Sequence, residues 1–274
     1  RPQNFFSIGN VVDKYLHMKL SFLFSNEGSY SRFATLNLIK KIIKINPQII
    51  HLHNIHCWYL NYSLLFNFFK NNRIKVIWTF HDCWPFTGHC THYDLVKCYK
   101  WKTKCEKCPS FKEYPASLRD NSQKLFFKKK NLYGDFDFDI VTPSVWMKNE
   151  VSQSFLKNKR IHIINNGIDL GIFKRRESGF RKECKCEGKF IVLGVSFGWG
   201  YKKGLDVFIE LSKRLSNDFK IVLVGTDKKV DKSLPDSIIS IHSTNNQVQL
   251  AEIYSAADVF LNTSREETFP TVDL

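Results

Sequence analysis

Reactive side chains are concentrated between His81 and Cys108. The stretch holds three histidines, two aspartates and five of the eight cysteines of the chain: His81, His89, His92, Asp82, Asp94, Cys83, Cys90, Cys98, Cys105 and Cys108. A loop that served only to cover a core would need few of these residue types. The sequence therefore predicts that this stretch either takes part in chemistry or binds a metal.

Four of these cysteines have a spacing that suits zinc. Cys105 and Cys108 form a CxxC pair, six residues separate Cys98 from that pair, and seven separate Cys90 from Cys98. A structural zinc ion is held by four such ligands and stabilises loops that are too irregular to fold unaided. The two nearby histidines are competing ligands. The alternative is four reduced, partly buried thiols, and the sequence leaves both open.

The elements before this stretch must position His81 and Asp82. Residues 75–80 form an apolar run that predicts a buried strand, and the two polar residues follow at its carboxyl end. The earlier elements are expected to be a strand or buried turn over 15–24, a helix over 33–45, a strand over 48–53 and a short helix over 62–69. This order predicts a parallel sheet with ligand-binding loops at the carboxyl ends of its strands.

The chain continues with a second series of alternating elements. A helix is expected over 123–133, then a strand within 138–144 that turns into a helix capped by Ser144, and a short strand over 160–164. The second series is expected to have strands over 190–195, 221–225, 238–242 and 258–262, and helices over 205–215 and 247–256. Asn166 and Gly167 indicate a turn between the two series. We therefore expect an α/β protein with two domains, residues 1–165 and 166–274.

Composition and charge limit the class of protein. The 274 residues are 43% hydrophobic, which is enough for packed cores, and the net charge of +15 implies attraction to the phosphates of nucleotides, lipid head groups or nucleic acid. Solvated lysines alone would also account for this charge. No run reaches the roughly eighteen apolar residues of a membrane span. The first residues do not open a signal peptide, so we expect a cytoplasmic fragment.

Eight separated motifs together resemble the family 4 glycosyltransferases. They are HLHN at 51–54, WTFHD at 78–82, TPS at 142–144, NNGID at 165–169, YKKGLDVFIEL at 201–211, LVGT at 223–226, YSAADVFLNTS at 254–264 and EETFPTV at 266–272. Each motif alone is weak, but their order over most of the chain is specific. The resemblance implies the GT-B fold, in which two Rossmann-like domains with parallel sheets face each other across a cleft, the second of them incomplete here.

The resemblance also implies roles for particular residues. Family members transfer a sugar, with retention of configuration, from a UDP- or GDP-linked donor and require no cofactor for transfer; catalytic zinc is therefore not expected. His81 and Glu267 match the catalytic positions. The donor-binding positions correspond to Lys202, Lys203, Gly204, Glu266, Thr268, Phe269 and Pro270, and the cleft positions to Asp82, Asn166 and Gly167. The acceptor would be a glycan or a lipid-linked sugar in bacterial surface polysaccharide assembly, and positive charge would hold the protein at the inner face of an anionic membrane.

Two departures from the family pattern bear on the donor site. Phe197 stands where family members carry an arginine six residues before the lysine that corresponds to Lys203. The second glutamate of the family motif would be the residue that follows Leu274, and no glycine-rich loop is recognisable near the start. The alternatives are a glycosyltransferase-like protein without activity and a basic, zinc-containing module that binds nucleic acid. The scattered lysines disfavour the latter, so no nucleic acid is expected as a partner.

Overall fold

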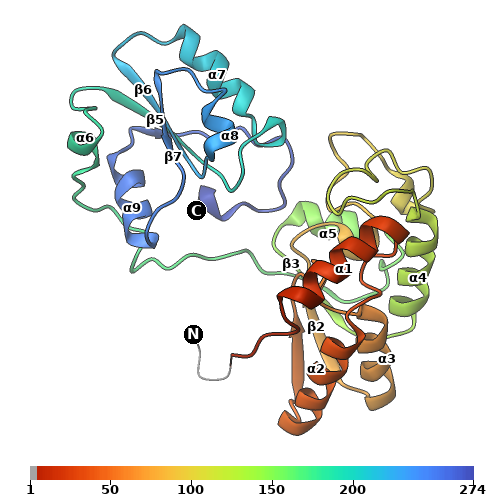
Figure 1. The fold of residues 1–274 in the computed structure, drawn as a ribbon. Helices are drawn as coiled ribbons and strands as arrows, with labels where there is room; N and C mark the ends of the chain where they lie inside the picture. Colours follow the sequence, from red (N-terminus) through yellow and green to blue (C-terminus); the bar gives the residue numbers. More distant parts are fainter. Residues whose placement is uncertain (1–4) are drawn as a thin grey trace. The chain divides into compact units, whose positions relative to one another are not determined.

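The computed structural model describes residues 5–274, which form two compact units that divide between Asn165 and Asn166 (Figure 1). Unit 1 precedes this point and unit 2 follows it. Each unit contains a four-stranded sheet in which every pair of neighbouring strands is parallel. The two parallel sheets that the alternation of strands and helices predicted are therefore confirmed.

The sheet of unit 1 has the strand order β1-β2-β3-β4. Its strands are β1 (Ile49–Leu52), β2 (Lys75–Thr79), β3 (Asp139–Thr142) and β4 (Ile161–Ile163). In the register of the sheet, Trp78 pairs with Leu52 on one side and with Ile140 on the other. Because β1 and β2 are parallel neighbours, the loops after Leu52 and after Thr79 leave the sheet at the same edge.

Helices cover this sheet with aromatic side chains. The helices of unit 1 are α1 (Val11–Phe24), α2 (Arg32–Ile45), α3 (Tyr62–Asn72), α4 (Ser122–Gly134) and α5 (Val145–Val151). Asn61 begins α3, since its side chain accepts a hydrogen bond from the Leu64 backbone at 3.0 Å. The rings of Phe66 and Tyr133 lie 4.7 Å apart beneath α3 and α4, and both are fully buried. They form the centre of the core of unit 1.

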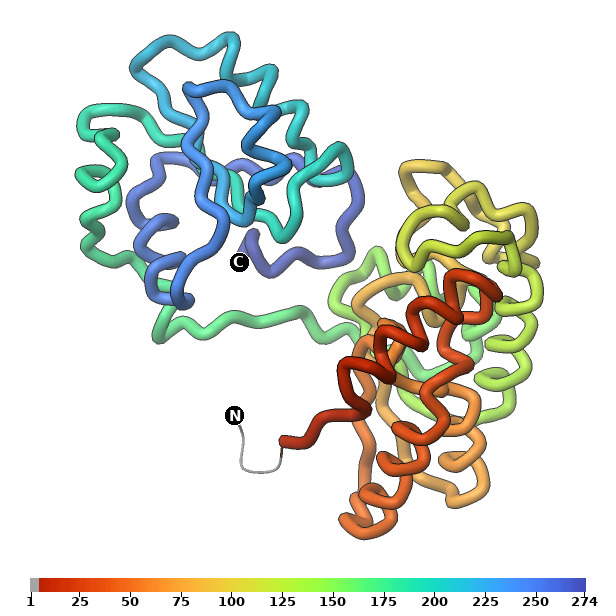
Figure 2. The backbone as a smooth tube through the Cα atoms, viewed as in Figure 1, coloured from red at the N-terminus to blue at the C-terminus, as the bar shows by residue number. Residues whose placement is uncertain are grey.

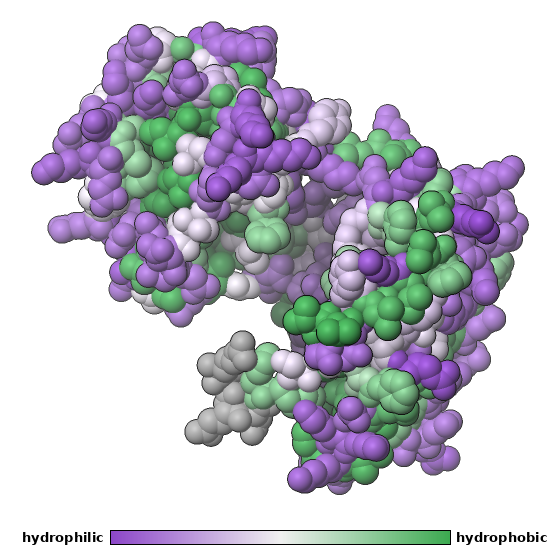
Figure 3. Space-filling model, in the orientation of Figure 1, coloured by the Kyte–Doolittle hydropathy of each residue, from purple (hydrophilic) through white to green (hydrophobic). Residues whose placement is uncertain are grey.

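The predicted strand or buried turn over 15–24 is wrong, because these residues belong to helix α1. Asn10 and Asp13 start the helix with reciprocal bonds between side chain and backbone. Only His17 and Ser21 are buried, while apolar side chains such as Leu16 and Phe24 are exposed along it. Figure 3 shows hydrophobic surface along this helix. An apolar composition without a period of two does not specify a strand. None of the helices within residues 5–274 is long and apolar enough to cross a membrane.

The segment between β2 and α4 contains little regular structure. Its short 3-10 turns are η1 (Trp84–Phe86) and η2 (Lys100–Lys102). The end of the segment is fastened to the end of α1, because the Leu118 backbone donates to the Phe22 carbonyl at 2.9 Å and the Asn121 amide donates to the Ser25 carbonyl at 2.7 Å. Figure 2 shows this segment as a long irregular loop beside α4. Hydrogen bonds and side-chain packing, rather than a ladder of backbone bonds, hold it in place.

The sheet of unit 2 has the order β7-β6-β5-β8. Its strands are β5 (Phe190–Val195), β6 (Phe219–Val224), β7 (Ile238–Ile241) and β8 (Val259–Phe260), and its helices are α6 (Phe180–Glu183), α7 (Leu205–Arg214), α8 (Lys228–Asp231) and α9 (Gln247–Ala256). Leu193 of β5 and Val222 of β6 are fully buried on the central strands. Phe208 of α7 packs in a separate cluster with Val192 and Leu223 of the same strands.

Candidate functional site

Two loops of unit 2 meet beyond the carboxyl ends of β5 and β8. The first contains the 3-10 turn η3 (Tyr201–Lys203), and the second follows β8. The Thr263 hydroxyl donates to the carbonyls of Lys203 at 2.9 Å and of Gly204 at 3.2 Å. Gly204 has φ +69°, and a Cβ atom there would lie 2.3 Å from the Thr263 hydroxyl oxygen. Glycine is therefore required for the two loops to approach each other this closely.

This approach brings together two lysines and two glutamates that the sequence analysis placed in the donor site. The Lys203 ammonium donates a hydrogen bond to the Glu267 carboxylate, and Lys202 Nζ lies 3.5 Å from Glu266 Oε2. Lys203 and Glu267 are both about half-buried, whereas Glu266 is buried. The arrangement offers ammonium groups for phosphate oxygens beside carboxylates that can accept hydrogen bonds from sugar hydroxyls.

The residues after Glu267 complete this loop. The Thr268 hydroxyl is buried without a hydrogen-bond partner among the side chains and backbone of residues 5–274. The Asn166 side-chain amide donates to the Phe269 carbonyl at 2.9 Å, so the first residue of unit 2 fastens the loop before Pro270 and the 3-10 turn η4 (Thr271–Asp273). The unpartnered hydroxyl gives the loop one more group that a polar ligand can satisfy.

Arg265 is a residue of this site that sequence reasoning missed. Its guanidinium pairs with Asp206 of α7 at 2.7 Å and lies over the Tyr201 ring, 4.0 Å from its centroid. Its backbone also donates to the Lys202 carbonyl at 2.9 Å. Phe197, at the position of the missing family arginine, is fully exposed. Its position in the sequence could have indicated its role, because Arg265 directly precedes Glu266 and Glu267 in the loop that follows a predicted strand.

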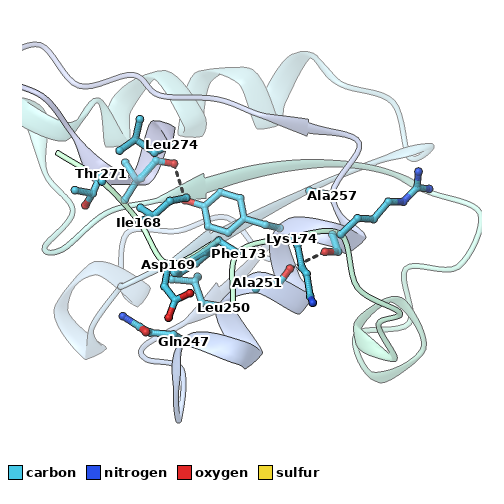
Figure 4. Close-up of a pocket in the computed structure, with 15 residues that line it drawn as sticks. Ile168, Asp169, Phe173, Lys174, Gln247, Leu250, Ala251, Ala257, Thr271 and Leu274 are labelled. Atoms are coloured by element: carbon cyan, nitrogen blue, oxygen red, sulfur yellow. Dashed lines mark hydrogen bonds between the residues drawn. The ribbon is translucent and has the colours of Figure 1, made fainter. Parts of the chain in front are cut away.

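A cavity of about 830 Å³ lies elsewhere in unit 2 (Figure 4). It is lined by the chain after Asn166, by α9 and by the last residues, among them Ile168, Phe173, Leu250 and Thr271. Gly167 is the one predicted site residue that lines it, whereas Lys203 and Glu267 do not. Size alone does not define a binding site, so we place the candidate site at the loops where charged groups converge.

In unit 1, His81 lies where β1 and β2 end together. His81 Nε2 is 2.9 Å from Nδ1 of His53, and the two rings are stacked with centroids 5.2 Å apart. Burial lowers the pKa of His81, and the neighbouring His51 adds to this effect although Asp82 opposes it. The ring is therefore neutral near pH 7 and able to accept a proton. His53 was missed, although its alternation with His51 in the HLHN motif places both near the end of the strand.

Asp82 faces a different partner from its neighbour His81. Asp82 Oδ2 is 2.8 Å from His56 Nε2, and Oδ1 accepts a bond from the Trp84 backbone at 2.9 Å. Burial alone would lower the pKa of His56, but its hydrogen bonds to Asp82 and Cys57 outweigh this and raise the pKa to about 10. The same contact with His56 outweighs burial at Asp82 and lowers the pKa of its carboxyl. The two side chains form an imidazolium–carboxylate pair.

The four cysteines of the predicted zinc site line one small cavity together with His89. The Gly88 backbone donates to Cys105 Sγ at 3.3 Å, and the thiols of Cys90 and Cys108 are hydrogen-bonded to each other. All eight cysteines are free. Across residues 5–274, no group of three or more His, Cys, Asp or Glu side chains is arranged so that it could hold a metal ion. The side chains as they lie therefore correspond to the alternative of reduced, partly buried thiols.

Two family models match this chain. Residues 9–171 match the family described as Glycosyltransferase Family 4, and residues 189–274 match the one described as Glycosyl transferases group 1. Since the first match covers more than half of the chain, the protein belongs to glycosyltransferase family 4. The predicted family is thus confirmed.

A curated relative is similar to part of this chain. The sequence is 33% identical to WcaC of Escherichia coli (strain K12) over 132 residues, which are 45% of this chain. WcaC is named for a proposed role as a glycosyl transferase of colanic acid biosynthesis. The chain spans about a third of that relative, 32% of its length.

Solved structures confirm the GT-B fold class. Sucrose-phosphate synthase from Thermosynechococcus elongatus matches 86% of this chain and 55% of its own, with 18% identity and a TM-score of 0.56. Anabaena Alr3699/HepE, in complex with UDP and glucose, matches 86% of this chain and 59% of its own, with 14% identity and a TM-score of 0.55. At these identities the likeness shows the fold alone.

Proposed function

We propose that this protein transfers a sugar from a nucleotide-diphosphate-sugar donor to a glycan or lipid-linked acceptor, with retention of configuration. The observation that carries the proposal is the contact between Lys203 and Glu267, which joins a cation and a carboxylate from two loops at the strand ends of unit 2. Sugar transfer requires charge stabilisation of the leaving diphosphate and groups that hold the sugar hydroxyls, and this pair supplies one of each.

The surrounding residues have supporting roles in this proposal. Lys203, with Lys202 beside it, neutralises the diphosphate as it leaves. Glu267 and the buried Glu266 accept hydrogen bonds from the donor sugar, and the Thr268 hydroxyl adds a donor. Phe269 and Pro270 shape the loop, which the Asn166 amide fastens. Gly204 allows the loops to meet, as its left-handed backbone and its closeness to Thr263 require.

On the acceptor side we propose His81 as the group nearest the transferred sugar. Its ring is half-buried and neutral near pH 7, so it can accept a hydrogen bond from a sugar hydroxyl. Asp82 holds His56 rather than His81 and thereby shapes the loop beside it. Gly167, which follows the boundary between the units, is proposed to shape the cleft-side loop.

The relatives support the class of substrate. HepE is described in complex with UDP and with UDP-glucose, and the name of WcaC refers to colanic acid biosynthesis. We infer a UDP- or GDP-linked donor and a role in surface polysaccharide assembly. The cytoplasmic location and the association with the inner face of an anionic membrane stay predictions.

Titration calorimetry with a panel of UDP- and GDP-sugars tests the proposal. We expect one of these donors to bind, and its binding to be weakened in Glu267→Gln. A parallel gel-shift series at increasing salt tests nucleic acid. Tight binding to DNA without binding of any nucleotide-sugar would contradict the proposal, and donor binding without transfer to any acceptor would favour the inactive alternative.

We also propose that Cys90, Cys98, Cys105 and Cys108, which line one small cavity, hold a structural zinc ion. Support comes from the convergence of the thiols in a segment with little regular structure, and from the backbone donor at Cys105. The purified, reduced protein is expected to contain about one equivalent of zinc. The double variant Cys105→Ser/Cys108→Ser should lose the metal and Cys184→Ser should keep it. A folded protein without zinc ends this inference.

A further inference from the structure

The loop after β1 holds a cysteine in an unusual backbone conformation. Cys57 and Trp58 have φ +76° and +60°, in the left-handed region that residues other than glycine seldom adopt. Cys57 is half-buried, so its thiol remains within reach of solvent. The neighbouring contacts hold both residues in this conformation, which costs on the order of 1 kcal/mol for each. Strained backbone of this kind is found where a side chain must point in one particular direction.

The thiol of Cys57 ends a row of three reactive groups. Its Sγ lies 3.1 Å from His56 Nδ1, and His56 Nε2 lies 2.8 Å from Asp82 Oδ2. The Tyr114 hydroxyl lies 3.0 Å from the same sulfur atom. A nucleophile, a base and a carboxylate that orients the base are the parts of an activated thiol. None of these contacts is needed for the donor site of unit 2.

Charged and titratable groups around Cys57 favour its thiolate. The groups that face it are His56 and Tyr59 of its own loop, Tyr114 of the irregular segment, Asp82 after β2, and the buried Glu27 with Lys129 of α4 beside it. Burial raises the pKa of Cys57 and Glu27 adds to this, but the bonds to His56 and Tyr114 and the charge of His56 outweigh both, so the net pKa lies below its ordinary value. The sulfur is held beside an imidazolium.

We propose that Cys57 is a modification site that exchanges with low-molecular-weight disulfides. The Cys57 thiolate attacks one sulfur of the disulfide, the disulfide bond breaks, and the other sulfur leaves as a thiolate that takes a proton from solvent. The product is a mixed disulfide on Cys57, and no other oxidant is consumed. A thiol reductant reverses the step.

The other cysteines lack this combination of features. Cys83, Cys90, Cys105 and Cys186 are buried. Cys184 is half-buried like Cys57, but burial raises its pKa, which makes it a matched control within the same chain. Cys98 and Cys108 line one small cavity with two other cysteines and His89. The pKa of Cys108 is also lowered, mainly by its bond to the Cys90 thiol rather than by an imidazolium.

The test is a time course of the whole reduced chain with glutathione disulfide, quenched in acid and mapped by peptide mass spectrometry. At pH 7 we expect Cys57 to be modified about tenfold faster than Cys184 or more. Between pH 8 and pH 6 the rate at Cys184 should fall about tenfold per pH unit, because its thiolate fraction falls by the same factor. The rate at Cys57 should fall less steeply. Equal rates at Cys57 and Cys184, or faster reaction at Cys108, would overturn the proposal.

Three variants separate activation of the thiol from mere exposure. His56→Gln removes the imidazolium and is expected to bring the rate at Cys57 down to that of Cys184. Tyr114→Phe removes a single hydrogen bond, leaves the ion pair intact, and should slow Cys57 less; it serves if His56→Gln does not fold. Cys57→Gly suits the left-handed backbone, so it should fold and show no label in this loop. An unchanged rate at Cys57 in both of the first two variants would also overturn the proposal.

Discussion

Replacing Lys203 with alanine is expected to lower kcat/KM for sugar transfer by a factor on the order of 100 to 1,000, the usual cost of removing a group that stabilises charge in a transition state. The variant loses the ammonium that lies beside Glu267 and leaves that carboxylate without its partner. Lys202 is held near Glu266, 3.5 Å away, and cannot fill both positions. Initial rates with the donor that binds in calorimetry provide the measurement.

Lys213→Ala is the matched control for this prediction. Lys213 lies on α7, ten residues along the chain, and makes an exposed pair with Glu210 at 3.4 Å. Exposed pairs of this kind contribute little to stability, so the control should transfer sugar like the unchanged protein. If the contact between Lys203 and Glu267 were only structural, Lys203→Ala would lower the melting temperature while the folded fraction kept its donor affinity. That result would contradict the proposed role.

The motifs of unit 2 allowed the residues that meet at the candidate site to be predicted as a group. Lys203 and Glu267 are 64 residues apart in the chain, yet the family motifs placed both at the ends of parallel strands, where loops converge. The helix predicted over 247–256 has those bounds in α9. These features could be predicted because they depend on short-range periodicity and on the order of strands, both of which can be read in the sequence.

Contacts within irregular loops could not be predicted in the same way. His81 and Asp82 were both expected in the cleft, but their partners were not predicted: Asp82 binds His56, and His81 faces His53. His53 and His56 stand in the loop after β1, where Cys57 has a left-handed backbone that no residue type in that loop signals. Helix α1 was missed for a related reason, since its apolar side chains face solvent and leave no amphipathic pattern toward the core.

Lys129 is the second residue whose replacement is expected to have a large effect, here on stability. It lies on α4 and is 1% exposed, and its ammonium donates to the carbonyls of Trp84 at 2.6 Å and Thr87 at 3.2 Å. The ammonium also lies 3.4 Å from the centroid of the Trp84 ring. The Trp84 indole in turn donates to the buried Glu27 at 2.9 Å. One lysine therefore joins α4 to the irregular segment and to the end of α1.

Lys129→Ala is expected to lower the free energy of unfolding by about 3–5 kcal/mol, because it leaves two buried carbonyls and the carboxyl group of Glu27 without their cation. Urea unfolding followed by tryptophan fluorescence measures this, since every tryptophan except Trp199 lies in unit 1. Lys130→Ala, one position along and exposed, is the control. Equal urea midpoints for the two variants would show that Lys129 does not hold these elements together.

The pH dependence distinguishes the charge of Lys129 from the packing of its stem. Burial lowers the pKa of Lys129 to about 7 and raises that of Glu27 to about 7. The folded protein thus binds fewer protons at Lys129 than the unfolded chain between pH 7 and 10.5, so this group makes stability rise with pH across that window. The contribution of Glu27 is full below pH 4.5 and is lost as the pH rises through 7. Lys129→Met keeps most of the aliphatic part of the side chain but has no charge. In this variant the rise of the unfolding free energy above pH 7 should disappear. Its loss of stability near pH 7 should be smaller than that of Lys129→Ala.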